Sequence, residues 1–260
     1  MAIKKILAIG DTHCGSMVGL THPNWMVKKE RNAEMYKLQV EMWDNYCQIL
    51  DDFGKVDALI VNGDAIDGKG VKAGGTEQIT VDMLEQTDMA IACFEQIEFK
   101  KAFFTYGTPY HTAGKSGEDF DKIIANHFKA PIVDELNLDI DGFIFNVKHK
   151  VGSSNSPFNR SAPAGKHRLW DALNSLREKD VVADIYLRSH VHYFAFCGES
   201  NWVAFTLPAL QASMTKFGAR QCVGITDWGM CLFLVDDGKL AGWECQTIEL
   251  ESSKKKIIKF

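Results

Sequence analysis

The chain has 260 residues, of which 46% are hydrophobic and 24% charged, and its formal net charge is -5. This composition supplies a full hydrophobic core and excludes a disordered or low-complexity protein, although the length alone permits one large domain or two small ones. The acidic balance argues against strong nonspecific binding of duplex DNA, which usually needs a basic face, but leaves room for a local basic cleft.

The first half of the chain predicts alternating strands and helices. Hydrophobic patterning predicts strands at 4–10, 57–62 and 101–106, and helices at 31–53, 77–98 and 117–128. Gly54 is a plausible stop for the first helix, and Thr76 is placed to cap the second. This order predicts parallel strands joined by right-handed crossovers.

The second half is predicted to be mostly strands. Strands are expected at 136–141, 143–148, 183–188, 193–198, 202–207, 229–236 and 239–248, with one helix at 163–178. Asp141-Gly142 and Asp237-Gly238 are hairpin turn signals. No linker rich in Pro, Gly or Ser divides the chain, so we expect a single domain over 1–260, with two packed sheets and helices outside.

Seven cysteines, an odd number without a C-x-x-C pair, indicate free thiols in a reducing compartment. The N-terminus leads straight into a strand without a signal-peptide pattern, and no apolar run approaches membrane-spanning length. We therefore expect a soluble cytoplasmic protein that makes no membrane contact.

Three polar motifs each follow an apolar, strand-like run. They are Gly10-Asp11-Thr12-His13, Gly63-Asp64-Ala65-Ile66-Asp67 and Ser189-His190-Val191-His192. The ends of buried strands are where an α/β protein builds its site, and imidazole and carboxylate ligands suit divalent metals. Each motif alone also occurs in ordinary turns, but the three together predict a metal site.

These motifs resemble the calcineurin-like metallophosphoesterases, whose pattern is D-x-H, G-D-x-x-D, G-N-H, a lone His and G-H-x-H. The matching residues are Asp11, His13, Gly63, Asp64, Asp67, His149 as the lone histidine, His190 and His192, with Ser189 in place of the last glycine. The resemblance implies an α/β fold, a four-layer α/β/β/α sandwich of two mixed sheets. It also implies that the later strands, over 202–248, complete the second sheet.

The third motif departs from the family pattern. Gly107-Thr108-Pro109-Tyr110-His111 stands where the family has G-N-H, and resembles a phage and prophage variant with a G-T-x-x-H segment. Thr108 would replace the ligand asparagine, either through its hydroxyl or by leaving that position to water. The departure leaves open whether the second metal is bound and what His111 does.

The resemblance implies two divalent ions, with manganese expected first and iron, zinc, nickel or magnesium as alternatives. Asp11, His13, Asp64 and His192 would hold one ion, and Asp64, His149 and His190 the other, with Asp64 bridging. Such a pair clamps a phosphate and activates water at neutral pH.

Two further residues are candidates for catalysis. His111 would protonate the leaving oxygen or hold the phosphoryl group, and Asp67 would orient a ligand histidine. The alternatives are that Asp67 caps the glycine loop, that His111 is a hydrogen-bonded loop residue, and that His149 ends a strand without binding metal.

The loop after His149 offers candidate phosphate partners. Ser153, Asn155 and Arg160 lie in it, and arginine can bind phosphate bidentately; the alternative is a solvated polar loop. Other candidates are Lys69 and Lys72 at the rim of the cleft, and Tyr110, Phe158 and Tyr193, which could stack a base or belong to the core.

We therefore expect a metal-dependent phosphoester hydrolase, first a phosphodiesterase or nuclease acting on nucleotides or nucleic acid in a bacterial or phage-infected cell. A phosphomonoesterase, including a protein phosphatase, is the alternative, and a homodimer could complete the substrate cleft. A catalytically silent scaffold with the same fold is the alternative of another class, favoured by the missing asparagine. A structural zinc protein fits poorly, because the ligands include two aspartates and no thiolate cluster.

Overall fold

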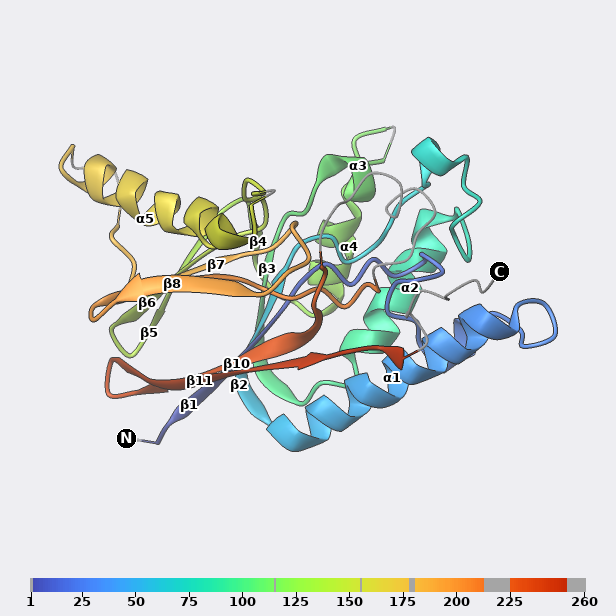
Figure 1. The fold of residues 1–260 in the computed structure, drawn as a ribbon, viewed down its shortest axis with the longest axis horizontal. Helices are drawn as coiled ribbons and strands as arrows, with labels where there is room; N and C mark the ends of the chain where they lie inside the picture. The colour runs from blue at the N-terminus through green and yellow to red at the C-terminus, as the bar shows by residue number, and fades with distance from the viewer. Residues whose placement is uncertain (1, 115, 155, 178–180, 213–224, 252–260) are drawn as a thin grey trace, which may run out of the picture.

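Two mixed β-sheets pack face to face, and helices cover their outer faces (Figure 1). The computed structural model describes residues 2–114, 116–154, 156–177, 181–212 and 225–251. The first sheet has the order β11-β10-β1-β2-β3-β4, and the second has the order β5-β6-β7-β9-β8.

The strands of the first sheet are β1 (Lys4–Ile9), β2 (Val56–Asn62), β3 (Phe99–Thr105), β4 (Ile132–Val133), β10 (Trp228–Asp236) and β11 (Lys239–Ile248). Those of the second are β5 (Leu136–Ile140), β6 (Phe143–Lys148), β7 (Ile185–Arg188), β8 (Ala195–Glu199) and β9 (Trp202–Thr206). The helices are α1 (Ala33–Phe53), α2 (Met83–Phe94), α3 (Pro109–Thr112), α4 (Phe120–His127) and α5 (Ala162–Ser175). Three short 3₁₀ turns lie at Pro23–Trp25, Val71–Ala73 and Pro157–Asn159.

Alternation along β1 explains the layers. Leu7 and Ile9 point into a core shared with the helices α1, α2 and α4, whereas Ile6 and Ala8 point into the core between the two sheets. A smaller cluster that includes Ala164 lies between α5 and the second sheet. Three cores therefore separate four layers, and the predicted α/β/β/α sandwich of two mixed sheets is confirmed.

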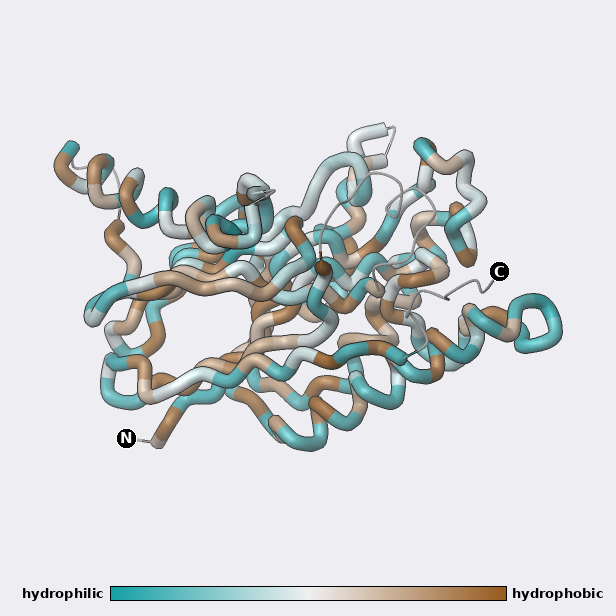
Figure 2. The backbone as a smooth tube through the Cα atoms, viewed as in Figure 1, coloured by the Kyte–Doolittle hydropathy of each residue, from teal (hydrophilic) through white to brown (hydrophobic). Residues whose placement is uncertain are grey.

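Figure 2 shows α1 alternating between hydrophobic and hydrophilic residues, as expected for a helix with one buried face.

The parallel strands predicted for the first half are confirmed, because β1, β2, β3 and β4 pair in parallel. The expected place of the last strands is wrong. β10 pairs antiparallel with β1, and β11 pairs antiparallel with β10, so both strands belong to the first sheet. Only β9 and β8 extend the second sheet beyond β7. β10 is apolar on both faces, since Met230 and Phe233 point into different cores, and such a strand fits in the interior of a sheet.

The first helix ends where predicted, and the second begins later than predicted. Gly54 has a φ of 62°, and its N–H bonds the carbonyl of Leu50. Thr76 does not cap a helix; α2 begins at Met83 with Asp82 as its cap, which accepts the N–H of Leu84 at 2.9 Å. The residues before Asp82 instead form a loop that reaches the candidate site described below.

Both predicted hairpin turns are confirmed. Asp141 and Gly142 have φ values of 54° and 92°, and Asp237 and Gly238 have values of 47° and 70°. Positive φ at both central residues is the requirement of the tight turns whose twist matches a hairpin. The short elements β4 and α3 were not predicted, because two and four residues are too few to show a periodicity.

The six described cysteines are all free, and Cys222 lies outside the described residues. Within the described ranges, the helices are too short or too polar to traverse a lipid bilayer.

Candidate metal centre

Both sheets bring the ends of parallel strands to one edge of the sandwich. The strands β1, β2 and β3 run parallel in the first sheet, as β6, β7 and β9 do in the second. The candidate ligands follow these strands directly: Asp11 and His13 after β1, Asp64 after β2, Thr108 after β3, His149 after β6, and His190 and His192 after β7. The fold thus gathers all the predicted ligands at one place.

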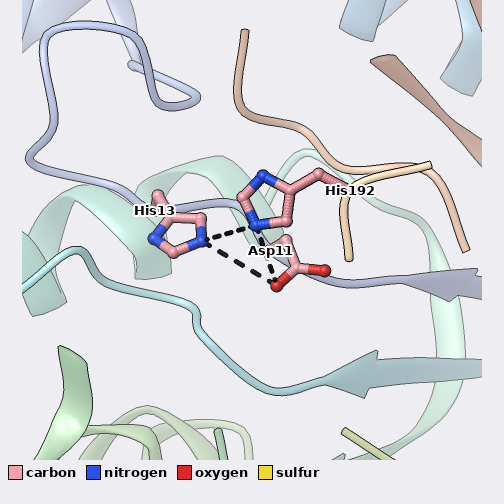
Figure 3. A group of neighbouring side chains, drawn as sticks. All are labelled: Asp11, His13 and His192. Atoms are coloured by element: carbon pink, nitrogen blue, oxygen red, sulfur yellow. Dashed lines mark hydrogen bonds and ion pairs between the residues drawn. The ribbon is translucent and has the colours of Figure 1, made fainter. Parts of the chain in front are cut away.

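One group of possible ligands consists of Asp11, His13 and His192 (Figure 3). The two imidazole rings face one another, with their Nε2 atoms 3.2 Å apart. Oδ1 of Asp11 lies 3.4 Å from Nε2 of His192 and 3.8 Å from Nε2 of His13. Three ligand atoms thus converge on one point, which is the arrangement a divalent cation requires.

A second group consists of Asp64, His149 and His190. Oδ2 of Asp64 lies 3.0 Å from Nε2 of His149. The hydroxyl of Thr108 is 3.3 Å from that same Nε2 and 3.2 Å from Nδ1 of His190. Thr108 therefore presents an oxygen to the second group at the point where the family pattern has an asparagine.

Hydrogen bonds on the far nitrogen fix two of the imidazole rings. Nδ1 of His13 lies 2.9 Å from Oδ1 of Asp67, and Nδ1 of His149 lies 2.7 Å from the carbonyl oxygen of Asn62. Both partners are acceptors, so each ring carries its proton on Nδ1 and turns Nε2 to the centre. The other oxygen of Asp67 accepts a hydrogen bond from Gln78 at 2.5 Å. Asp67 is thus placed to orient His13.

His111 lies beside the first group. Its Nδ1 donates to the backbone carbonyl of Asp67 at 2.8 Å, and its ring meets that of His13 edge-on, with the ring centroids 4.6 Å apart. Burial and the neighbouring His13 lower the pKa of His111 below its ordinary value. His111 is therefore a neutral imidazole at neutral pH.

In the centre, ionised aspartate side chains lie next to positively charged histidine side chains. Burial alone would raise the pKa of Asp64, but His149 and His13 lower it to about 2. Burial would likewise lower the pKa of His149, but Asp64 and Asp11 raise it to about 9. The buried carboxylates thus require positive charge next to them, which histidine protons supply here and which a bound cation would supply in their place.

The backbone at the candidate ligands is strained. Asp11, His13, Asp64, His190 and His192 have φ values between 45° and 75°, in the left-handed region that side chains other than glycine rarely adopt. Of the described non-glycine residues, only Lys129 and the hairpin residues Asp141 and Asp237 share this feature. Strain of this kind is stored at functional sites.

Asp11 also carries an unsatisfied atom. Its side chain is fully buried, yet Oδ1 has no hydrogen-bond partner in the described part of the chain. Oδ2 accepts the backbone N–H of His190 at 2.8 Å, which aims Oδ1 at the histidines. A buried oxygen without a donor costs free energy, and a divalent cation at this point would satisfy it. The residues present therefore fit a metal ion.

Asn62 supports the centre and was missed by the sequence analysis. Its amide donates to the hydroxyl of Ser189 at 2.9 Å, and its side-chain oxygen accepts from Thr105 at 2.6 Å. The first contact ties the two sheets together and gives a role to Ser189, which stands where the family pattern has glycine. The signal in the sequence is a polar residue directly after the apolar run at 58–61.

Asp121 is a second support that the sequence analysis missed. Its carboxylate is buried and accepts the N–H of Gly107 at 2.9 Å and the N–H of Ala65 at 3.2 Å. It therefore holds together the loop that carries Asp64 and the loop that carries Thr108. Burial, followed by the charges of Asp64 and Asp119, raises the pKa of Asp121 to about 7.

A cavity of about 190 Å³ opens directly on the centre. It is lined by His13, Asp64, Asp67, His111, His190 and His192, with Lys72, Tyr110 and Gln211 among its outer residues. The predicted rim residue Lys72 lies over the ring of Tyr110, with Nζ 4.7 Å from the ring centroid.

Two of the predicted phosphate partners, Ser153 and Arg160, do not line this cavity. The guanidinium of Arg160 lies over the ring of Tyr193, 4.2 Å from its centroid, and donates to the carbonyl of Ile225. Ser153 is exposed, and neither it nor Arg160 is among the described residues that line the cavity. Asn155 lies outside the described residues.

No family model and no curated protein matches this chain. Three solved structures illustrate its likeness to known proteins. An archaeal phosphodiesterase is 12% identical, with 94% of this chain and 99% of that chain covered and a TM-score of 0.44. A predicted phosphoesterase from Streptococcus pneumoniae is 13% identical, with 95% and 99% covered and a TM-score of 0.41. Vps29 from Entamoeba histolytica, in complex with Zn²⁺, is 12% identical, with 95% and 99% covered and a TM-score of 0.42. At these values the activity has to be inferred from the side chains of this chain itself.

Proposed function

We propose that this protein is a metal-dependent phosphoester hydrolase of the calcineurin-like type, with two divalent cations in one centre. The observation that carries the proposal is the convergence of two His/Asp groups, joined by Asp11. Its unsatisfied Oδ1 lies 3.4 Å from Nε2 of His192 in the first group and 3.9 Å from Nε2 of His149 in the second.

Each group would hold one ion. The first ion would be bound by Asp11, His13 and His192, and the second by Asp64, His149 and His190 with the hydroxyl of Thr108, while Asp64 would still be the ligand that both ions share. Divalent cations bound there would polarise the phosphoryl oxygens and activate water as the nucleophile. Manganese is our first choice; iron, zinc, nickel and magnesium are alternatives, because carboxylates suit manganese and magnesium whereas imidazoles suit iron, zinc and nickel.

The protein residues next to the ligands would handle the proton. His111 is neutral and keeps its Nδ1 proton on the carbonyl of Asp67, so its Nε2 is left as an acceptor. It would take up a proton and deliver it to the leaving oxygen, or hold the phosphoryl group through it. Asp67 contacts His13 with its carboxylate and His111 with its carbonyl, and thereby sets the distance between a ligand and the proposed acid.

A phosphodiester is the substrate we favour. Residues of the centre line the cavity of about 190 Å³, and His149 and Thr108 also form part of the wall of a second cavity of about 550 Å³. Two cavities leave room for a substituent on each side of the phosphate, as in a nucleotide or nucleic-acid diester. A monoester would need only one of them.

The test compares hydrolysis of bis(p-nitrophenyl) phosphate and p-nitrophenyl phosphate with added manganese. We expect turnover of the diester that is lost in EDTA and in Asp64→Asn, and kept in Asp88→Asn, whose aspartate is exposed on α2. Turnover of the monoester alone would favour a phosphatase. If the protein shows no turnover of either substrate and binds no metal, the proposal is overturned in favour of a silent scaffold.

A further inference from the structure

The second cavity lies next to the candidate metal centre but is lined by different residues. Thr108 and His149 form its inner wall, and three lysines, Lys122, Lys148 and Lys150, lie around it. It is larger than the cavity that opens on the first group of ligands, about 550 Å³ against about 190 Å³. Residues of the centre thus contribute to the walls of two cavities.

The short helix α3 separates the two cavities. Tyr110 and His111 line the first cavity, whereas Thr108 and Pro109 line the second. A phosphate chain with one phosphate at the centre would therefore have neighbouring groups close to both cavities.

Two of the three lysines are available to an anion. Lys148 is paired with Glu135 at 2.8 Å. Lys122 and Lys150 are exposed, and neither makes an ion pair within the described part of the chain. Their ammonium groups are therefore free to pair with an anionic ligand.

The cavity also carries two carboxylates. Asp119 accepts the backbone N–H of Lys122 at 3.3 Å as the cap of α4, and Asp134 lies at the exposed rim. With Lys148 paired to Glu135, the two remaining lysines balance these two aspartates, so the positive charge is local to Lys122 and Lys150 and does not extend over the cavity. This suits one or two phosphates better than the continuous charge of a duplex, which the net charge of -5 also disfavours.

We propose that the second cavity binds the phosphate next to the scissile one in a single-stranded oligonucleotide, through Lys122 and Lys150. This inference rests on the proposed function and adds a substrate class to it. The half-buried ring of Tyr106, in the same wall, offers a surface on which the intervening base stacks. Aromatic stacking beside a short basic groove is how proteins hold single strands without reading their sequence.

The test measures binding of fluorescein-labelled octathymidylate by fluorescence anisotropy with manganese present, using phosphorothioate linkages so that the strand resists hydrolysis. We expect the double variant Lys122→Ala/Lys150→Ala to raise the Kd about tenfold. Each lysine lost should also reduce the slope of log Kd against log salt by about 0.7 to 1. The matched control is Lys37→Ala/Lys55→Ala, which removes two exposed lysines, one on α1 and one just after it, and should change neither quantity.

A kinetic arm separates this inference from the proposed function. In the double variant with manganese, the ratio of kcat/KM for the octamer to kcat/KM for bis(p-nitrophenyl) phosphate should fall at least fivefold. The inference is wrong if the small diester is hydrolysed but the octamer is not bound. It is also wrong if Lys122→Ala/Lys150→Ala leaves both the Kd and the salt slope unchanged. In either case the proposed hydrolase function is unaffected. Tighter binding of a phosphoserine peptide than of the octamer, weakened by the same substitutions, would replace the nucleic acid by a protein substrate. Absence of any metal-dependent turnover would instead remove the proposed function.

Discussion

Nδ1 of His13 and Oδ1 of Asp67 are 2.9 Å apart, although the two residues are separated by 54 positions in the sequence. Asp67 is almost fully buried, and its other oxygen is held by Gln78, so its position is fixed from two sides. This contact makes Asp67 the residue that orients the first ligand histidine.

Asp67→Asn should therefore weaken metal binding without unfolding the protein. An amide lacks the charge that keeps the proton on Nδ1 of His13, and loss of such a partner typically lowers metal affinity about 10- to 100-fold. Competition with a chelating dye measures the affinity, and circular dichroism checks the fold. Wild-type affinity in Asp67→Asn would mean that Asp67 serves the loop and not the metal.

Asp121→Ala should destabilise the fold and loosen the second ligand group. It removes the acceptor of two buried N–H groups, those of Ala65 and Gly107, and each unsatisfied group costs about 1–3 kcal/mol. We expect a loss of about 2–4 kcal/mol in the free energy of unfolding, measured by urea denaturation. Asp121→Asn keeps one acceptor oxygen and should lose about half as much. Equal stability of the three proteins would contradict the bridging role.

Thr108 can be tested in both directions. Thr108→Asn restores the residue of the family pattern and should raise the affinity of the second site for manganese, because an amide oxygen is a better ligand than a hydroxyl. Thr108→Val removes the hydroxyl at constant shape and should lower that affinity. The measurement is bound manganese per chain as a function of free manganese. Identical curves for all three would show that Thr108 is not a ligand.

His167 is not one of the candidate ligands, and we expect it to make the stability of the fold depend on pH. Burial, then the charge of Arg188, lowers its pKa to about 4 from the ordinary 6.5, and its Nδ1 accepts a hydrogen bond from Arg188 at 3.1 Å. The folded protein favours the neutral ring, so its contribution is complete above pH 6.5 and is lost as the pH falls towards 4.

The comparison is made with His167→Gln, which cannot titrate. Between pH 7.5 and 4.5, the wild type should lose about 1 kcal/mol more of its unfolding free energy than the variant, a figure reduced for the part of the ring that solvent reaches. Urea denaturation at both pH values measures the difference. Parallel losses in the two proteins would contradict the depressed pKa.

The sequence predicted the parts of the site that a short motif encodes. Asp11, His13, Asp64, His190 and His192 follow strands recognisable from apolar runs, and parallel strands bring such ends together. These residues, with His149, could be found without coordinates. Their roles as ligands remain proposals.

The parts that depend on which loops meet were not predictable in this way. The hydrogen bond from Asn62 to Ser189 joins residues 127 positions apart. Asp121 lies on a helix, and the helical pattern shows only that it is polar, not that its carboxylate accepts two N–H groups next to the centre. The place of β10 was missed for a related reason. Strand patterning predicts that a strand is buried, but not beside which strand it lies.

The left-handed backbone at the candidate ligands has a consequence for engineering. Glycine would adopt these conformations freely, whereas a residue with a Cβ pays about 1–2 kcal/mol at each. A screen for heat resistance alone, without metal or substrate, should thus enrich glycine at positions such as His13 and His190. Such variants would be more thermostable but would lack candidate metal ligands. Any stabilised version of this protein therefore has to be selected for metal retention at every round.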